Sequence, residues 1–493
     1  MTPTPSRVLS RELLPASIAV FATAALASFQ ALGLAAALPE IAGDLGDIEL
    51  LPWVITAYLV TSSLATVVAG PFIDSVGVSR MFRIAVIVFA ASGFAAGFST
   101  SMPMLVGLRA LQGIGGGLVI STGTAAISLV YPTHLVSRAF AANATVWGVM
   151  GVAGPAIAAV MLTFLSWHWV LFINLPLGIV ALIAGWRIFP GPFGEREGRF
   201  DVIGILLVAA LTIATLFAVD SLSIESIYWL AGAAVATVLY VVHARRTRNP
   251  LVRLEHIVPQ PYRGLALSTA LMLMGTMAMS DYIPLFVRAG RGASSAITAW
   301  SVLPLTVGWT TGATISSRLG DRHSESWVMV LGFMINIPAL ALAWVVVTFE
   351  APLPFAFLVF FAAGVGVGMS TNAALTLLRA VTDPSKMGRV GAAHLFARNQ
   401  GFTFGAAVGG AVLLLVVTDR LGDLSLVRDL LAGSTTADTS SDAAMAVESG
   451  YATTIAVGLV LSSLGWLSAA GLRRHLTDAR MAKRGPDAAA TPG

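Results

Sequence analysis

The sequence contains no cysteine and carries little charge for its length. Without cysteine, a disulfide bond, a thiolate metal site and a cysteine nucleophile are all excluded. Only 11% of the 493 residues are Asp, Glu, Lys or Arg, whereas these residues make up about 25% of a soluble domain. Charge this sparse cannot cover a soluble protein of this size, so we expect most of the surface to face lipid.

Further absences restrict the function. The chain has no glycine-rich run that ends in Lys and then Ser or Thr, so ATP is not the expected energy source. The histidines show no metal-ligand spacing, and no Ser-His-Asp or paired-carboxylate arrangement can be read, so we expect no metal, no cofactor and no enzyme. The net charge of +4 is not a signal for nucleic-acid binding. The first apolar run is as long as a membrane span and shows no cleavage site, so no signal peptide is expected.

What the chain does contain is long apolar runs, with 56% hydrophobic residues and a mean hydropathy of +0.83. Fourteen segments reach the length of about 20 residues that a membrane-spanning helix needs. The sequence therefore predicts an all-α polytopic membrane protein. The segments cover residues 15–38, 50–72, 80–98, 103–130, 137–164, 168–189, 201–220, 227–244, 264–287, 296–317, 327–348, 353–379, 388–418 and 450–472.

Lysine and arginine indicate how these spans are oriented. If both termini are cytoplasmic, 23 of the 29 basic residues (29 − 4 − 2) fall in cytoplasmic segments, four fall outside, and Arg109 and Arg398 lie within spans. A wrong number of spans would scramble this alternation. We therefore expect a multi-pass protein of the inner cell membrane with both termini in the cytoplasm.

A weak internal repeat organises the chain. The second and the tenth predicted spans both end in an acid, Asp74 or Asp321, that a basic residue follows. Two such copies indicate parallel repeats of six helices. We expect an N-terminal six-helix bundle over residues 1–190, an inserted helix pair with cytoplasmic linkers over 191–262, a C-terminal six-helix bundle over 263–476 and a disordered cytoplasmic tail over 477–493.

Four stretches, in the same order along the chain, match the motifs of one membrane-protein family. They are GPFIDSVG at residues 70–77, LVGLRALQG at 105–113, GVAGP at 151–155 and WHWVLFINLPLG at 167–178. With these motifs the chain resembles the major facilitator superfamily, and within it the fourteen-helix drug:proton antiporters. The resemblance implies the major facilitator fold, with two six-helix bundles plus two extra helices, and it associates Arg109 with proton coupling.

The chain departs from the family pattern on the first helix. The family often has an acid nine residues before the proline that ends this helix, and counting back from Pro39 gives Gln30. Because glutamine cannot titrate, a coupling carboxylate from the first helix is missing.

Asp281 is the only acid well inside a predicted span. Asp281 and Arg109 each lie about six residues from the outer end of their helices, which places both roughly 9 Å below the outer surface at about 1.5 Å per residue. The two can therefore face each other. We predict that Asp281 carries the proton and that Arg109 tunes its affinity. The alternatives are that Asp281 caps a loop near the lipid headgroups and that Arg109 snorkels to the outer interface.

Other polar and aromatic residues within spans are candidates for a substrate cavity. Each of them also suits an interfacial belt or hydrogen bonding between helices. Arg398 lies deeper than Arg109, so it is harder for it to snorkel. The candidates are Gln30, Tyr58, Asn143, Trp147, Asn174, Tyr282, Trp300, Arg398 and Asn399.

Two further sets of residues are predicted to serve a conformational change. Acids and bases at helix ends can pair across the two halves in one state and separate in the other, or they can merely set topology. The predicted latch consists of Asp74, Arg80, Asp321 and Arg322. In the fifth span, Gly151, Gly154 and Pro155 form a predicted hinge, since proline removes a backbone donor. The alternative is an ordinary, tolerated membrane proline.

Together these features predict a monomeric transporter that exports small amphipathic compounds, such as drugs or antibiotics, in exchange for protons by alternating access. The expected partners are a small-molecule substrate, protons and the lipid bilayer. Two alternatives stay open, an exporter of lipids or natural products and a non-transporting receptor or scaffold of the same fold. Arg109, Asp281 and Arg398 argue against the scaffold, which has no need to bury charge.

Overall fold

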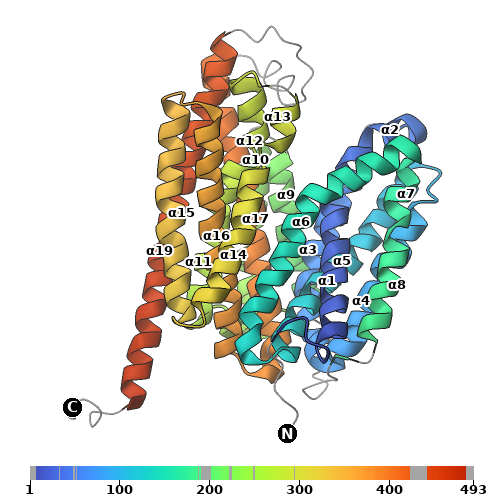
Figure 1. Cartoon of the computed structure of the whole chain (residues 1–493), viewed down its shortest axis with the longest axis vertical. Helices are drawn as coiled ribbons and strands as arrows, with labels where there is room; N and C mark the ends of the chain where they lie inside the picture. Colours follow the sequence, from blue (N-terminus) through green and yellow to red (C-terminus); the bar gives the residue numbers. More distant parts are fainter. Residues whose placement is uncertain are drawn as a thin grey trace.

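The structure is a computed structural model, and it describes residues 7–484 except 33, 48–49, 51–52, 187, 190–200, 221–224, 248–249, 294 and 422–440. In this part of the chain every regular element is a helix. Two helical bundles stand side by side in Figure 1. We call the end of the molecule where α1 (Leu14–Leu32) begins and α19 (Ser441–Arg484) ends the base, and the opposite end the top.

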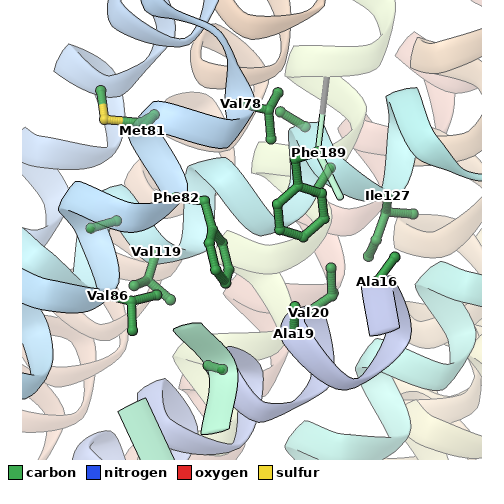
Figure 2. Packing of buried hydrophobic residues seen from close by; sticks show 14 of the residues in the cluster. Ala16, Ala19, Val20, Val78, Met81, Phe82, Val86, Val119, Ile127 and Phe189 are labelled. Carbon is green, nitrogen blue, oxygen red and sulfur yellow. The ribbon is translucent and has the colours of Figure 1, made fainter. Parts of the chain in front are cut away.

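The first bundle is built around α5. Helix α5 packs against α1, α3 and α4, and α8 packs against α1 and α4. Near the base, the ring of Phe82 packs edge-on against Phe189, with 4.7 Å between centroids, beside Ala16 and Val20 of α1 (Figure 2). The elements of this bundle after α1 are η1 (Leu34–Ala37), α2 (Leu38–Leu45), α3 (Trp53–Val76), α4 (Val78–Ala96), α5 (Met102–Val130), α6 (Thr133–Phe164), α7 (Trp167–Phe172) and α8 (Asn174–Gly185).

The second bundle holds the C-terminal part of the chain. Helix α16 packs against α14 and α15, while α11 packs against α17 and α19. Its elements are α11 (Tyr262–Ser280), α12 (Ile283–Leu285), the π-helix η4 (Phe286–Gly290), α13 (Ser295–Trp300), α14 (Leu303–Leu319), α15 (Glu325–Thr348), α16 (Leu353–Val381), η5 (Pro384–Lys386), α17 (Met387–Leu421) and α19.

The two bundles meet along two seams, α6 against α14 and α3 against α17. The inserted helices α9 (Val202–Asp220) and α10 (Glu225–Arg246) pack against each other, and α9 also packs against both α3 and α17. The pair therefore covers the second seam. Its lower end is held by Asp201, whose carboxylate lies 2.7 Å from Nε2 of His243 and accepts a 2.8 Å hydrogen bond from the N–H of Leu251. Between Leu251 and α11 lies the short η3 (Leu254–His256).

Close helix contacts repeat between the two bundles. A β-carbon on Gly113 or Gly117 of α5 would overlap a carbonyl oxygen of α3, and one on Gly364 or Gly368 of α16 would overlap a carbonyl oxygen of α14. Small residues four apart let membrane helices approach in this way. The carbonyls belong to Tyr58 and Ser62 in α3 and to Leu305 and Trp309 in α14. Tyr58 and Leu305 are 247 residues apart, and so are Ser62 and Trp309 (305 − 58 and 309 − 62). Asp74 and Asp321 have the same separation (321 − 74), which agrees with the predicted repeat.

The all-α polytopic fold of two bundles plus two extra helices is confirmed. Each of the fourteen predicted segments coincides with one helix or with consecutive short helices. Ten helices of the described part are long and apolar enough to cross a membrane, and the described parts of α1 and α9 are shorter apolar helices. The count of fourteen crossings and the domain boundaries stay predictions. The tail was expected to be disordered from residue 477, but α19 continues to Arg484, through a segment rich in helix formers.

Of the segments expected as single helices and found split, three are split before a proline, and these three splits have the same cause. Helices α7, α11 and α13 end at Phe172, Ser280 and Trp300, four residues before Pro176, Pro284 and Pro304. Proline cannot donate to the carbonyl four residues back, and its ring collides with it. By contrast, Pro71 and Pro338 are accommodated inside α3 and α15.

Candidate transport site

Arg109 of α5 lies at the centre of a polar cluster in the first bundle, where only 1% of its surface is exposed. Its Nε donates to the carbonyl of Val54 at 3.1 Å, and its Nη1 donates to Oε1 of Gln30 at 3.1 Å and to Oε1 of Gln112 at 2.6 Å. Its guanidinium carbon lies 4.4 Å from the ring centroid of Tyr58. Dipoles and an aromatic face therefore solvate this cation. Among the described carboxylates, none forms an ion pair with it.

Glycines leave the space in which this cluster is packed. A β-carbon on Gly93 of α4 would lie 2.5 Å from Nε2 of Gln112 and 2.8 Å from Nδ2 of Asn174. A β-carbon on Gly116 of α5 would lie 2.8 Å from the hydroxyl oxygen of Tyr58. The glycine-rich run of α5 thus brings helices α3 and α4 close enough to enclose Arg109.

Gln30 occupies the place where the family pattern has an acid, and the structure shows what it does there. Its Oε1 accepts the hydrogen bond from Arg109, and its Nε2 donates to the carbonyl of Val170 at 3.1 Å. The side chain is fully buried. A neutral amide therefore takes the position from which a carboxylate would pair with Arg109.

Asp281 lies at the break between α11 and α12, in the second bundle. Its backbone N–H donates to the carbonyl of Met277 at 3.2 Å, while its side chain is exposed and has no hydrogen bond or ion pair with the described residues. The neighbouring Tyr282 donates its hydroxyl to the carbonyl of Ala406 on α17 at 3.0 Å, which fixes the break against that helix. Asp281 caps the C-terminus of α11, and a helix C-terminus favours a positive charge over a carboxylate.

The structure does not bring Arg109 and Asp281 together. Arg109 is enclosed in the first bundle with its own acceptors, and Asp281 is exposed in the second. The facing pair expected from their equal depth is therefore not formed in this conformation. Their roles in proton coupling stay predictions.

Arg398 is half-buried on α17, and its guanidinium carbon lies 5.5 Å from the ring centroid of Phe402. Its Nε is buried without a hydrogen-bond partner, and no described carboxylate pairs with it. Arg398 is thus a second cation in the membrane interior, less enclosed than Arg109.

The other candidate cavity residues fall into different surroundings. Gln30, Tyr58 and Asn174 belong to the buried surroundings of Arg109, and Tyr282 holds the break beside Asp281. Trp300 is 55% exposed at the end of α13. The half-buried residues Asn143 and Trp147 lie on α6, and the half-buried Asn399 lies on α17. That these residues line one cavity stays a prediction.

Polar contacts join the two bundles at the base. The guanidinium of Arg138, near the start of α6, forms an ion pair with Asp321, which follows α14. Beside it, Asn372 of α16 donates to the hydroxyl of Ser137 at 3.1 Å. In addition, Arg379 at the end of α16 donates to the carbonyl of Ser128 at the end of α5. These contacts all link the first bundle to the second.

Of the predicted latch, the structure places one acid in an ion pair between the bundles. The basic partner of Asp321 is Arg138, whereas Arg80 and Arg322 are exposed and form no ion pair within the described residues. The side chain of Asp74 lies outside the described part.

The predicted hinge lies in an unbroken helix. Helix α6 runs from Thr133 to Phe164 through Gly151 and Gly154, of which the second is buried. The side chain of Pro155 lies outside the described part. A hinge at these residues stays a prediction.

Two residues of the site were missed from the sequence. Gln112 makes the shortest hydrogen bond to Arg109, and its position three residues later on the same helix was a usable signal. Arg138 had no such signal, because its partner lies 183 residues away. No group of three or more His, Asp or Glu side chains comes together among the described residues.

Comparison with known proteins places this geometry in a family. The family model described as Major Facilitator Superfamily matches residues 20–406. The chain is 25% identical over 408 residues to multidrug resistance protein 3 of Bacillus subtilis (strain 168), a match that covers 79% of this chain and 77% of that protein. It is 25% identical over 383 residues to the multidrug efflux pump SdrM of Staphylococcus aureus (strain N315), covering 76% and 84%. It is also 24% identical to the riboflavin transporter RibZ of Clostridioides difficile (strain 630), covering 75% and 81%.

Solved structures share the fold. The human organic anion transporter MFSD10 superposes with a TM-score of 0.62 at 12% identity, covering 92% of this chain and all of that one. The proton:xylose symporter XylE superposes with a TM-score of 0.61 at 14% identity, covering 91% and 94%. At such identities the likeness concerns the fold alone. The chain is thus a multi-pass membrane protein and belongs to the Major Facilitator Superfamily of transporters.

Proposed function

We propose that this chain exports small amphipathic compounds from the cell, across the cytoplasmic membrane, in exchange for protons. The observation that carries the proposal is Asp281, an exposed carboxylate without an ion pair at a helix break inside a membrane span. Glu448, a second acid inside a candidate span, is paired with Arg291. The names of two similar proteins, a multidrug resistance protein and a multidrug efflux pump, support export of this kind.

In the proposed cycle, the two bundles rock about the seams α6–α14 and α3–α17. The ion pair Arg138–Asp321 belongs to the state that is closed at the base. Asp281 takes up a proton while the top is open and releases it after the base opens. The buried cluster of Arg109 keeps the first bundle rigid during this motion, since three hydrogen bonds from Arg109 tie α5 to α1 and α3 and to its own Gln112.

Transport by the purified full-length chain tests the proposal. Proteoliposomes are made acidic inside by one pH unit, with the membrane potential clamped by valinomycin and potassium, and uptake of anionic, neutral and cationic aromatic dyes is measured. A one-for-one exchanger can concentrate its substrate up to about tenfold per pH unit, since one unit is worth about 1.4 kcal/mol. Accumulation of at least one dye that nigericin abolishes is the expected result. Equilibration of every dye without accumulation contradicts proton coupling.

Charge reversal at the base tests the latch. Both side chains of the Arg138–Asp321 pair are 43% exposed, and such pairs contribute about 0–1 kcal/mol. Asp321→Arg is expected to lower the population that is closed at the base by a few fold, because two cations then face each other. Since the chain has no cysteine, spin labels at Thr133→Cys and His323→Cys report the separation of the bundles by pulsed dipolar spectroscopy.

The matched control is the swapped variant Arg138→Asp with Asp321→Arg. It is expected to restore the distance distribution of the unmutated pair. An unchanged distribution in the single variant shows that the ion pair has no part in closing the base.

A further inference from the structure

The membrane interior of this chain carries more positive than negative charge. In the described spans, Arg109, Arg398 and Asp281 are the charged residues that lie at least seven residues from both ends of their spans. Arg109 is solvated by its own cluster, and Asp281 has no cationic partner. Arg398 therefore remains as an interior cation whose counter-charge the described residues do not provide.

Arg398 and the nearby His394 both carry hydrogen-bond donors that have no partner. The Nε of Arg398 is buried without a partner. One helical turn earlier, His394 is only 4% exposed, and neither of its ring nitrogens has a partner. Residues four apart share a helix face, and a neutral imidazole always has one N–H to donate. A buried donor without a partner is unfavourable, so the guanidinium and the imidazole together call for an acceptor that none of the described residues gives them.

Aromatic rings continue the same face of α17. Phe402, four residues after Arg398, lies under the guanidinium and is stacked on Trp309 of α14, with 6.1 Å between centroids and 3° between planes. Both rings are half-buried. Parallel rings present flat apolar faces, against which a further aromatic ring packs well.

We infer that Arg398 and His394 bind the carboxylate or sulfonate of an aromatic substrate, whose ring packs against Phe402 and Trp309. The inference rests on the proposed export function and narrows its substrates to aromatic anions. An anion accepts hydrogen bonds from both donors and supplies the missing counter-charge, whereas a cationic aromatic compound does neither.

The anion site is separate from the proposed proton site. Tyr282, next to Asp281, is bonded to Ala406, which lies eight residues beyond Arg398 on α17. At about 1.5 Å per residue this is roughly 12 Å along the helix. Asp281 can therefore change its protonation without contacting the bound anion, and the two sites are coupled through the motion of the bundles.

Equilibrium binding of two matched probes tests the inference. Naphthalene-1-carboxylate and 1-naphthylmethylammonium share a ring and differ in charge, and their binding to the purified full-length chain is followed by quenching of tryptophan fluorescence without any gradient. The carboxylate is expected to bind at least about tenfold more tightly than the ammonium. Arg398→Gln is expected to abolish this preference by weakening the carboxylate, while Arg398→Lys keeps it within a few fold. Arg420→Gln, an exposed site on the same helix, is the matched control.

The outcomes separate this inference from the proposed function. Equal binding of the two probes, no binding of the carboxylate at millimolar concentration, or an unchanged preference in Arg398→Gln each overturns the inference. A loss of preference in Arg398→Lys as large as in Arg398→Gln also overturns it, because the charge would then not be what is recognised. Because binding is measured without a gradient, the inference can hold even where proton-driven export fails. Proton-driven export can likewise be observed where the preference for the carboxylate is absent.

Discussion

Asp281→Asn is expected to abolish proton-driven accumulation of substrate and to leave substrate binding intact. Asparagine has the shape of the carboxyl group but cannot exchange a proton. Asp281 makes no side-chain hydrogen bond or ion pair with the described residues, so the change removes no stabilising contact. Under a gradient of one pH unit, the concentration ratio is expected to fall from as much as about tenfold to one. Dye accumulation in proteoliposomes measures the ratio, and tryptophan quenching measures binding.

The matched control for this prediction is Asp442→Asn, the same change at an exposed acid at the start of α19. It is expected to transport like the unmutated chain. The prediction has a second, kinetic readout, since an exchanger that has lost only its proton step still exchanges labelled for unlabelled substrate. If the Asp281→Asn variant still concentrates substrate against a gradient, another group carries the proton.

Composition and hydropathy were enough to predict the helices, because membrane spans are long and every backbone group must be satisfied within the helix. The breaks were harder to foresee. Pro176, Pro284 and Pro304 end helices four residues earlier, but Pro71 and Pro338 do not, so a proline in the sequence does not by itself predict a break. The break at Asp281 is the one before Pro284, and it places the acid at a helix end rather than within a helix.

Depth along a helix follows from the sequence, whereas the direction in which a side chain points follows from packing. Arg109 and Asp281 were expected to face each other because they lie at similar depths. Arg109 instead points to Gln30 and Gln112, because the glycines of α5 bring α3 and α4 against it. The pairing of Arg138 with Asp321 likewise depends on how two bundles meet, which no local pattern records.

Arg109→Met is expected to destabilise the first bundle and to abolish transport. Methionine fills much of the space, but it leaves the side-chain oxygens of Gln30 and Gln112 buried without donors and removes the extra bond to the carbonyl of Val54. Each such acceptor costs about 1–3 kcal/mol, so the free energy of unfolding is expected to fall by about 2 kcal/mol or more. Equilibrium unfolding in mixed micelles measures this change, and Arg420→Met, at an exposed arginine, serves as the control.

Stability and function are separated by a second substitution. Adding Gln112→Met to Arg109→Met removes the acceptor that makes the 2.6 Å bond together with its donor, and replacing both partners by apolar groups can be nearly neutral. The double variant is therefore expected to regain part of the lost free energy of unfolding. Its transport is expected to stay absent if Arg109 takes part in coupling, because an apolar side chain cannot respond to the charge of a proton or a substrate. If transport instead recovers in step with stability, Arg109 serves packing alone. In that case Asp281 alone carries the proton coupling.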